Sequence, residues 1–206
     1  MEKTLTITIP SYNVENTLRE TVDSLLVPSI LNDLEILIVN DGSKDSTSVI
    51  GHEYERQYPQ TVRVIDKKNG GHGSTINAGI QEAAGRYFKV VDGDDWLITE
   101  NMPRFIDDLK KTNADIVYNP FFEVNDQTRE RKLNGLENDA FTAEKVYDFD
   151  SIADQLSIQM HAMTYKTSIL KKHHITIDEH RFYVDAEYVL MPIPFVKTIE
   201  ILDYPM

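Results

Sequence analysis

Apolar residues along positions 1–119 recur with two spacings, one typical of β-strands and one typical of helices. Residues 4–10, TLTITIP, alternate threonine with leucine or isoleucine and therefore predict a strand. Residues 34–41, LEILIVND, form a nearly continuous apolar run, as a parallel strand covered on both faces does. Residues 14–26, VENTLRETVDSLL, instead repeat apolar side chains at helical spacing and predict an amphipathic helix.

The same spacings predict that strands and helices continue to alternate as far as Asn119. Further strands are expected at residues 62–66, 87–92 and 115–119, and further helices at 42–58, 74–85 and 99–112. Such alternation predicts an α/β fold with a mostly parallel central sheet flanked by helices.

The C-terminal third of the chain is less regular. Residues 121–133 are expected to form a hairpin whose tip lies near residues 125–127. Further helices are expected at 150–158, 168–173 and 186–195, and a last strand at 198–203. No repeat or linker divides the sequence, so we interpret residues 1–206 as a single domain.

Polar residues follow each of the predicted strands of the first half. The segments are PSYN (10–13), NDGS (40–43), DKKNGGHGS (66–74) and DGDD (92–95). Because ligands bind at the carboxyl ends of the strands in a parallel sheet, we expect these four segments to meet at one cleft.

Three carboxylates occupy four positions after the strand at 87–92, namely Asp92, Asp94 and Asp95. Three anions this close repel one another at neutral pH. A hard divalent cation such as Mg²⁺ or Mn²⁺, which takes oxygen ligands, would relieve that repulsion. An Asp-rich turn with no metal is the alternative, since Asp and Gly are common turn residues.

The composition disfavours several other kinds of function. Asp and Glu outnumber Lys and Arg by 34 to 21, for a net charge of −13, which disfavours nucleic acid as a partner. The absence of cysteine excludes disulfides, thiolate metal sites and cysteine nucleophiles. Because no apolar run is long enough to cross a bilayer and no signal-peptide pattern opens the chain, we expect a cytoplasmic protein with no transmembrane segment.

Taken together, four stretches resemble the family 2 glycosyltransferases of the GT-A fold. They are TITIPSYNVENTLRETVDSLL, EILIVNDGSKDST, NGGHGSTINAGIQEAAGRYFKVVDGDDW and FYVDAEYVL. The resemblance implies an inverting, metal-dependent enzyme that moves a sugar from a nucleoside-diphosphate donor, expected to be a UDP-sugar, to a hydroxyl of a carbohydrate or lipid-linked glycan. It also implies a role in surface polysaccharide or cell-wall glycan synthesis, with peripheral membrane association expected through the acceptor or through a C-terminal region beyond this sequence. Residues 1–119 would be the nucleotide-binding half and 120–206 the acceptor-side half.

The resemblance also assigns roles to individual residues. Asp41 would accept a hydrogen bond from the nucleotide base, Asp92 would contact the ribose, and Asp94 would hold Mn²⁺ or Mg²⁺ with help from Asp95. The full set of implied nucleotide-binding residues is Pro10, Ser11, Tyr12, Asn13, Asp41, Asn69, Gly70, Gly73 and Asp92. The glycines, with Gly71, would let the backbone approach the nucleotide closely.

The general base that takes the proton of the acceptor hydroxyl is expected to be Asp185. Members of the family usually carry a Glu-Asp pair here, whereas this chain has Val184-Asp185. Glu187 is a weaker candidate for the same role, and Asp185 could instead only cap the predicted helix at 186–195.

Two histidines and a pair of lysines near these segments also need an interpretation. His161 falls where members of the family approach the acceptor, and His72 could reach a phosphate from the glycine-rich segment, although a lone histidine is more often a packed or surface residue. The Lys67-Lys68 pair is expected to be a solvated turn.

Two other classes of function remain as alternatives. A sugar nucleotidyltransferase could share the sheet, but PSYNVENTLR is not its Gly-rich, Arg-containing signature. A non-catalytic nucleotide- or glycan-binding protein is favoured only by the missing Glu before Asp185. A Q-x-x-R-W motif of processive synthases is absent. Many relatives continue into a helical region where this sequence stops at Met206, so part of acceptor recognition is expected to lie beyond it.

Overall fold

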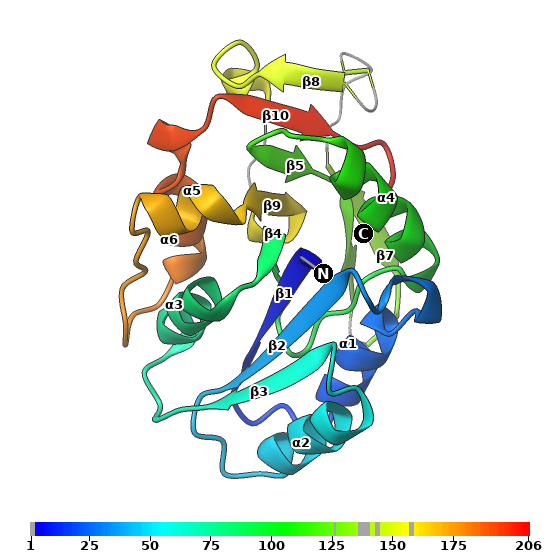
Figure 1. Ribbon diagram of the computed structural model, residues 1–206, viewed down its shortest axis with the longest axis vertical. Helices are drawn as coiled ribbons and strands as arrows, with labels where there is room; N and C mark the ends of the chain where they lie inside the picture. The colour runs from blue at the N-terminus through cyan, green and yellow to red at the C-terminus, as the bar shows by residue number, and fades with distance from the viewer. Residues whose placement is uncertain (1–2, 126, 136–140, 143–144, 157–158) are drawn as a thin grey trace.

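The computed structural model describes residues 3–125, 127–135, 141–142, 145–156 and 159–206 (Figure 1). Among these residues, the strands form one eight-stranded sheet and one two-stranded sheet. The strands are β1 (Lys3–Ser11), β2 (Leu34–Asn40), β3 (Val62–Asp66), β4 (Gly85–Val90), β5 (Ile116–Tyr118), β6 (Phe121–Val124), β7 (Arg131–Asn134), β8 (Lys145–Asp148), β9 (Met163–Lys166) and β10 (Thr198–Ile201). The α-helices are α1 (Leu18–Leu25), α2 (Thr47–Gln57), α3 (His72–Glu82), α4 (Met102–Lys111), α5 (Thr167–Lys172) and α6 (Val184–Leu190).

The large sheet has the order β3-β2-β1-β4-β9-β5-β10-β8. Parallel pairing joins β3, β2, β1 and β4, and it also joins β5 to β10. Antiparallel pairing places β9 between β4 and β5 and puts β8 at the edge. The predicted mostly parallel α/β sheet is therefore confirmed, and the strand expected at 198–203 is present as β10.

Strands β8 and β9 are not among the predicted strands, and β9 changes the arrangement more because it lies inside the sheet. It pairs with β4 at Phe88↔Tyr165 and with β5 at Ile116↔Tyr165, so one of its residues bridges two strands. The sequence pattern predicts no strand here. As a result, the 3₁₀ turn Met160–Ala162, directly before β9, lies next to the part of the sheet where β4 ends.

The helices cover both faces of the sheet (Figure 1). One apolar core joins β1, β2 and β3 to α1, α2 and α4, and it contains Leu18, Ile50 and Phe105. The other joins β4, β5 and β9 to α3, α5 and α6, and it contains Ile76 and Tyr188. Strands β1 and β2 are buried along almost their whole length, as expected for strands covered on both sides. Within the described residues, no helix has the length and apolar character of a membrane span.

Several boundaries differ from the expected ones for local reasons. Helix α2 begins at Thr47 rather than at residue 42, because residues 43–46 hold the segment after β1, for example through Ser46 N–H donating to Glu15 Oε2 (2.8 Å). The helix expected at 186–195 ends at Leu190, and a separate 3₁₀ turn, Ile193–Phe195, follows Pro192.

The C-terminal third of the chain has some of the predicted hairpin and helices but not all of them. Strands β6 and β7 form the expected antiparallel hairpin, although residue 126 of its expected tip lies outside the described residues. Helix α5 confirms the helix expected at 168–173. Instead of the helix expected at 150–158, the structure has turns and a 3₁₀ segment, Ala153–Gln155, with residues 157–158 outside the described part.

Candidate active site

The parallel register brings the ends of four strands to one edge of the sheet. Ser11 pairs with Asn40, and Asn40 pairs with Asp66, so β1, β2 and β3 end at the same level. Thr8 pairs with Val90, and Asp92 follows two residues later. The four polar segments predicted to meet do lie together, which confirms that part of the prediction.

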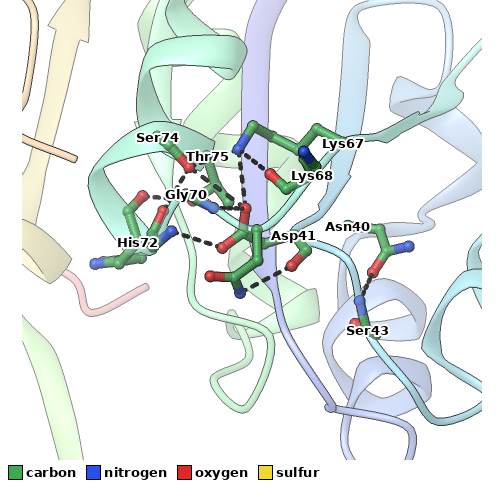
Figure 2. Close-up of polar contacts among 11 residues, drawn as sticks. Asn40, Asp41, Ser43, Lys67, Lys68, Gly70, His72, Ser74 and Thr75 are labelled. Atoms are coloured by element: carbon green, nitrogen blue, oxygen red, sulfur yellow. Dashed lines mark hydrogen bonds and ion pairs between the residues drawn. The ribbon is translucent and has the colours of Figure 1, made fainter. Parts of the chain in front are cut away.

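Asp41 is the centre of a hydrogen-bond network at this edge (Figure 2). The backbone N–H of Gly70 donates to its Oδ1 (2.9 Å) and that of Gly71 to its Oδ2 (2.8 Å). The side chain of Asn69 donates to the Asp41 carbonyl (3.0 Å). With only 2% of the residue exposed, the carboxylate positions the glycine-rich segment. Oδ1 also accepts a hydrogen bond from the Lys67 ammonium.

Lys67 is not part of a solvated turn, so that expectation is wrong. Its ammonium donates to Asp41 Oδ1 (2.9 Å), to Ser74 Oγ (2.7 Å) and to the Lys68 carbonyl (2.9 Å) (Figure 2). A buried carboxylate is costly without a charge partner, and Lys67 supplies that partner. Lys68 is exposed, as expected. Sequence alone shows two adjacent lysines without indicating which one turns inward.

The glycine-rich segment is held from the other side by the chain before α6. His180 N–H donates to the Gly70 carbonyl (2.7 Å). Gly71 precedes α3 with φ of 84°, in the region that favours glycine. A Cβ on Gly73 would overlap the Asp178 carbonyl oxygen, so Gly73 packs against protein backbone in addition to any contact with a nucleotide.

The segment after β1 combines buried and exposed predicted residues. Ser11 follows Pro10 at the end of β1, is buried, and donates through its hydroxyl to the Ile9 carbonyl (3.1 Å). Asn13 accepts from the Lys44 N–H (2.8 Å) and so ties this segment to the one after β2. Tyr12 is 47% exposed, so its ring is free to stack on a base.

The carboxylate turn meets a histidine from the segment before β9. Asp92, Asp95 and His161 each present a ligand atom, and these atoms all lie within 4.8 Å of one another. His161 Nδ1 lies 3.4 Å from Asp95 Oδ2. Asp94 is exposed at the same turn and is not one of these three residues. The position of His161 depends on β9, which explains why sequence spacing could not identify it as a neighbour of the turn.

His72 lies on the other side of the carboxylate turn. Its Nε2 is 3.0 Å from Asp92 Oδ1. Burial acts to lower the pKa of His72, but the hydrogen bond to Asp92 and the negative charges of Asp92, Asp185 and Asp94 outweigh it, so the pKa lies above its usual value. A protonated His72 would offset part of the negative charge of the turn and could reach a phosphate.

Asp185, the expected base, lies exposed in the first turn of α6. Its charge contributes to the raised pKa of His72, the histidine that contacts Asp92. Glu187, the weaker candidate, is engaged elsewhere, because its Oε2 accepts the Asp178 N–H (2.7 Å). Of the two carboxylates, Glu187 is therefore the one held by the backbone.

Lys89 is a buried cation beneath this cluster, and sequence analysis did not single it out. Its ammonium donates to the carbonyls of His161 (2.7 Å) and Met163 (3.4 Å), which fixes the segment that carries His161 to β4. Burial lowers the pKa of Lys89 to about 7, and the charge of Asp95 acts in the opposite direction.

The same fold occurs in solved glycosyltransferases. Staphylococcus aureus TarS, solved in complex with UDP, superposes with a TM-score of 0.77 at 20% identity over 97% of this chain and 57% of that chain. The mannosyltransferase PcManGT from Pyrobaculum calidifontis, solved with GDP-Man and Mn²⁺, has a TM-score of 0.66 at 13% identity and covers all of this chain and 56% of that one. These likenesses identify the fold as GT-A and confirm the expected fold class.

Sequence comparison identifies the family. The model of glycosyl transferase family 2 matches residues 6–173, and the chain therefore belongs to this family. Among its relatives is the glycosyltransferase EpsJ of Bacillus subtilis, which is 30% identical over 97% of this chain and 58% of its own length. The minor teichoic acid biosynthesis protein GgaB of the same organism is 33% identical over 70% of this chain and 16% of its own length. The chain thus spans little more than half of EpsJ and a small part of GgaB.

Proposed function

We propose that this protein transfers a sugar from a nucleoside-diphosphate donor to a hydroxyl group of a glycan acceptor, with inversion at the anomeric carbon and with help from a divalent cation. The observation that carries the proposal is the cluster of Asp92, Asp95 and His161, with ligand atoms within 4.8 Å of one another, at the strand edge where the nucleotide segments also meet.

The residues of this cluster fit a divalent cation. Two carboxylates and an imidazole provide oxygen and nitrogen donors, which suits Mn²⁺ better than Mg²⁺, because Mg²⁺ is bound through oxygen ligands and water. Asp94, exposed at the same turn, remains a candidate ligand alongside Asp95. When bound, the cation would neutralise the charge that develops on the leaving nucleoside diphosphate.

The protein's own groups would bind and orient the two substrates. Asp41 and the backbone of residues 69–71 would hold the nucleotide, with Tyr12 stacked on its base. Asp185 would accept the proton of the acceptor hydroxyl while the hydroxyl oxygen forms a bond to the anomeric carbon of the donor sugar. The bond between that carbon and the diphosphate oxygen breaks in the same displacement, and the diphosphate leaves with the electron pair. No covalent intermediate with the protein is required.

The nature of the donor is inferred from relatives. TarS has been solved with UDP and with UDP-GlcNAc, and a UDP-sugar is therefore the donor we propose here. PcManGT was solved with Mn²⁺, which agrees with the donor atoms of the cluster. GgaB and a poly(glycerol phosphate) polymerase of Staphylococcus epidermidis, 27% identical over 98% of this chain, are named for teichoic acid synthesis. A role in cell-wall or surface glycan synthesis follows as part of the proposal.

Thermal unfolding with nucleotides tests donor and cation together. The protein would be heated with UDP, GDP, dTDP or CDP, each with and without Mn²⁺. A ligand at about a hundred times its Kd adds about 2.7 kcal/mol to the free energy of unfolding. We expect a stabilisation by UDP that requires Mn²⁺. Equal unfolding temperatures under all conditions would contradict the proposal and favour a non-catalytic protein.

A further inference from the structure

A pocket of about 590 Å³ opens beside the carboxylate turn, and none of the residues predicted to bind the nucleotide lines it. Asp94 and Asp95 form part of one wall, and the β6–β7 hairpin forms another. The aromatic and polar side chains that line it include Trp96, Phe121, Phe122, Arg131, Gln159 and His161. A volume of this size, with aromatic walls and a few polar groups, is typical of sites for small organic ligands.

The pocket is separate from the proposed nucleotide site. None of the residues predicted to bind the nucleotide lines it, and all of them belong to the described part of the chain. It shares Asp94 and Asp95 with the carboxylate turn, so its inner end lies beside the proposed cation. A molecule in this pocket would therefore lie beside the proposed cation without taking the contacts of the nucleotide, as an acceptor must.

The hairpin end of the pocket combines an arginine with aromatic rings. The guanidinium of Arg131 lies 6.0 Å from the ring centroid of Phe122, and that of Arg129 lies 5.7 Å from the centroid of Trp96. Within the described residues, Arg131 forms no ion pair, and Glu123 is the one carboxylate of the hairpin that lines the pocket. A guanidinium held over a ring at the mouth of a pocket can bind a carboxylate or phosphate through two parallel hydrogen bonds.

We infer that this pocket binds the acceptor and that the acceptor is an acidic glycan, with a sugar ring against Trp96 and Phe122 and its phosphate or carboxylate on Arg131. The inference rests on the proposed function, because only a transferase needs a second substrate next to the donor. Asp94 and Asp95 at the inner end of the pocket would not repel such an acceptor strongly. The proposed cation offsets their charge, and the acid group of the acceptor would lie at the hairpin end.

Trp96 makes the inference directly measurable, because it is the only tryptophan in the chain. Its fluorescence would be recorded while glucose, glucose 6-phosphate or glucuronic acid is added to the protein saturated with UDP and Mn²⁺. We expect the two acidic sugars to change the fluorescence at concentrations at least about tenfold lower than glucose, because hydrogen bonds to charged groups contribute more than neutral ones. Arg131→Gln should abolish that difference.

Lys132→Gln is the matched control, because Lys132 neighbours Arg131 on β7, is also exposed and does not line the pocket. This variant should keep the preference for acidic sugars. Equal titrations with glucose and the acidic sugars would overturn the inference, and so would the absence of any response. Inorganic phosphate that titrates Trp96 as well as glucose 6-phosphate would show a simple anion site and would also overturn it.

The experiment separates this inference from the proposed function. Stabilisation of the same samples by UDP and Mn²⁺ is measured independently by thermal unfolding. If that stabilisation is present and the sugar response is absent, only the acceptor assignment fails. If the stabilisation is absent, the proposed function fails whatever Trp96 reports.

Discussion

His161 Nδ1 lies 3.4 Å from Asp95 Oδ2, although the two residues are far apart in the chain. The contact exists because β9 inserts antiparallel between β4 and β5 and brings the turn before it to the end of β4. Lys89 fixes that turn through the His161 carbonyl. The order of strands in the sheet thus completes a candidate cation site that the DGDD segment alone does not provide.

Removal of the His161 imidazole should weaken cation binding. We expect His161→Asn to lower the affinity for Mn²⁺ in the presence of UDP by about tenfold or more. Electron paramagnetic resonance of free Mn²⁺ measures this affinity. His174→Asn is the control, since His174 is exposed and has φ of 51°, which asparagine tolerates. Equal affinities in the two variants would remove His161 from the site.

Loss of the Asp185 carboxylate should affect the reaction and leave donor binding intact. Asp185→Asn is expected to reduce UDP release by about 10²–10⁴-fold, the usual contribution of a general base. Stabilisation by UDP and Mn²⁺ should not change. Glu179→Gln, an exposed carboxylate in the same segment, is the control and should keep full activity. An active Asp185→Asn variant would refute the assignment of the base.

The two neighbouring lysines should differ sharply in their effect on stability. Lys67→Met is expected to lower the free energy of unfolding by about 1–3 kcal/mol, because it leaves the buried Asp41 carboxylate without its cation. Lys68→Met should change it by less than about 0.5 kcal/mol, as exposed substitutions do. Denaturant unfolding measures both values. Similar losses in the two variants would show that the contact of Lys67 with Asp41 does not stabilise the fold.

His52 should make stability depend on pH. Hydrogen bonds to Asp66 and then to Glu55 raise its pKa above the ordinary 6.5, against the effect of burial. A raised folded-state pKa stabilises the protein below the unfolded-state value, and the stabilisation is lost as the pH rises through the folded-state value. Because the side chain is 38% exposed, the effect should be below about 1 kcal/mol.

His52→Gln should therefore lower the unfolding temperature more at about pH 5.5 than at about pH 9, relative to the native protein at each pH. Calorimetry at the two pH values measures the difference. Because the variant is compared with the native protein at the same pH, groups that titrate in both proteins do not contribute to the difference in unfolding temperature. A larger loss at the higher pH would have the wrong sign for a histidine stabilised in its charged form.

The first half of the fold could be predicted because each of its elements has a local pattern. Apolar alternation or a continuous apolar run marks β1 and β2, and amphipathic spacing marks α1 and α4. Strand β9 could not be predicted, because it lies in a segment of mixed pattern and its partners are in distant parts of the chain. Pairing of that kind is decided by tertiary contacts.

The candidate site was likewise predictable where it depends on the order of the strands and not where it depends on individual side-chain contacts. The rule that ligands bind at strand ends brought Asp41, Asn69 and Asp92 together correctly, because it depends only on the parallel register. The inward turn of Lys67 and the approach of His161 depend on side-chain partners that spacing does not reveal. The roles of Asp94, Asp95 and Asp185 in binding and catalysis remain predictions.

The most direct test of the proposed function is the anomeric configuration of the sugar product. The protein would be incubated with a UDP-sugar and Mn²⁺, with UDP release followed in time and the first product examined by proton NMR. We expect release that requires Mn²⁺ and a product whose configuration is opposite to that of the donor. Retained configuration, or no release of UDP from any UDP-sugar with Mn²⁺, would contradict inverting, cation-assisted transfer.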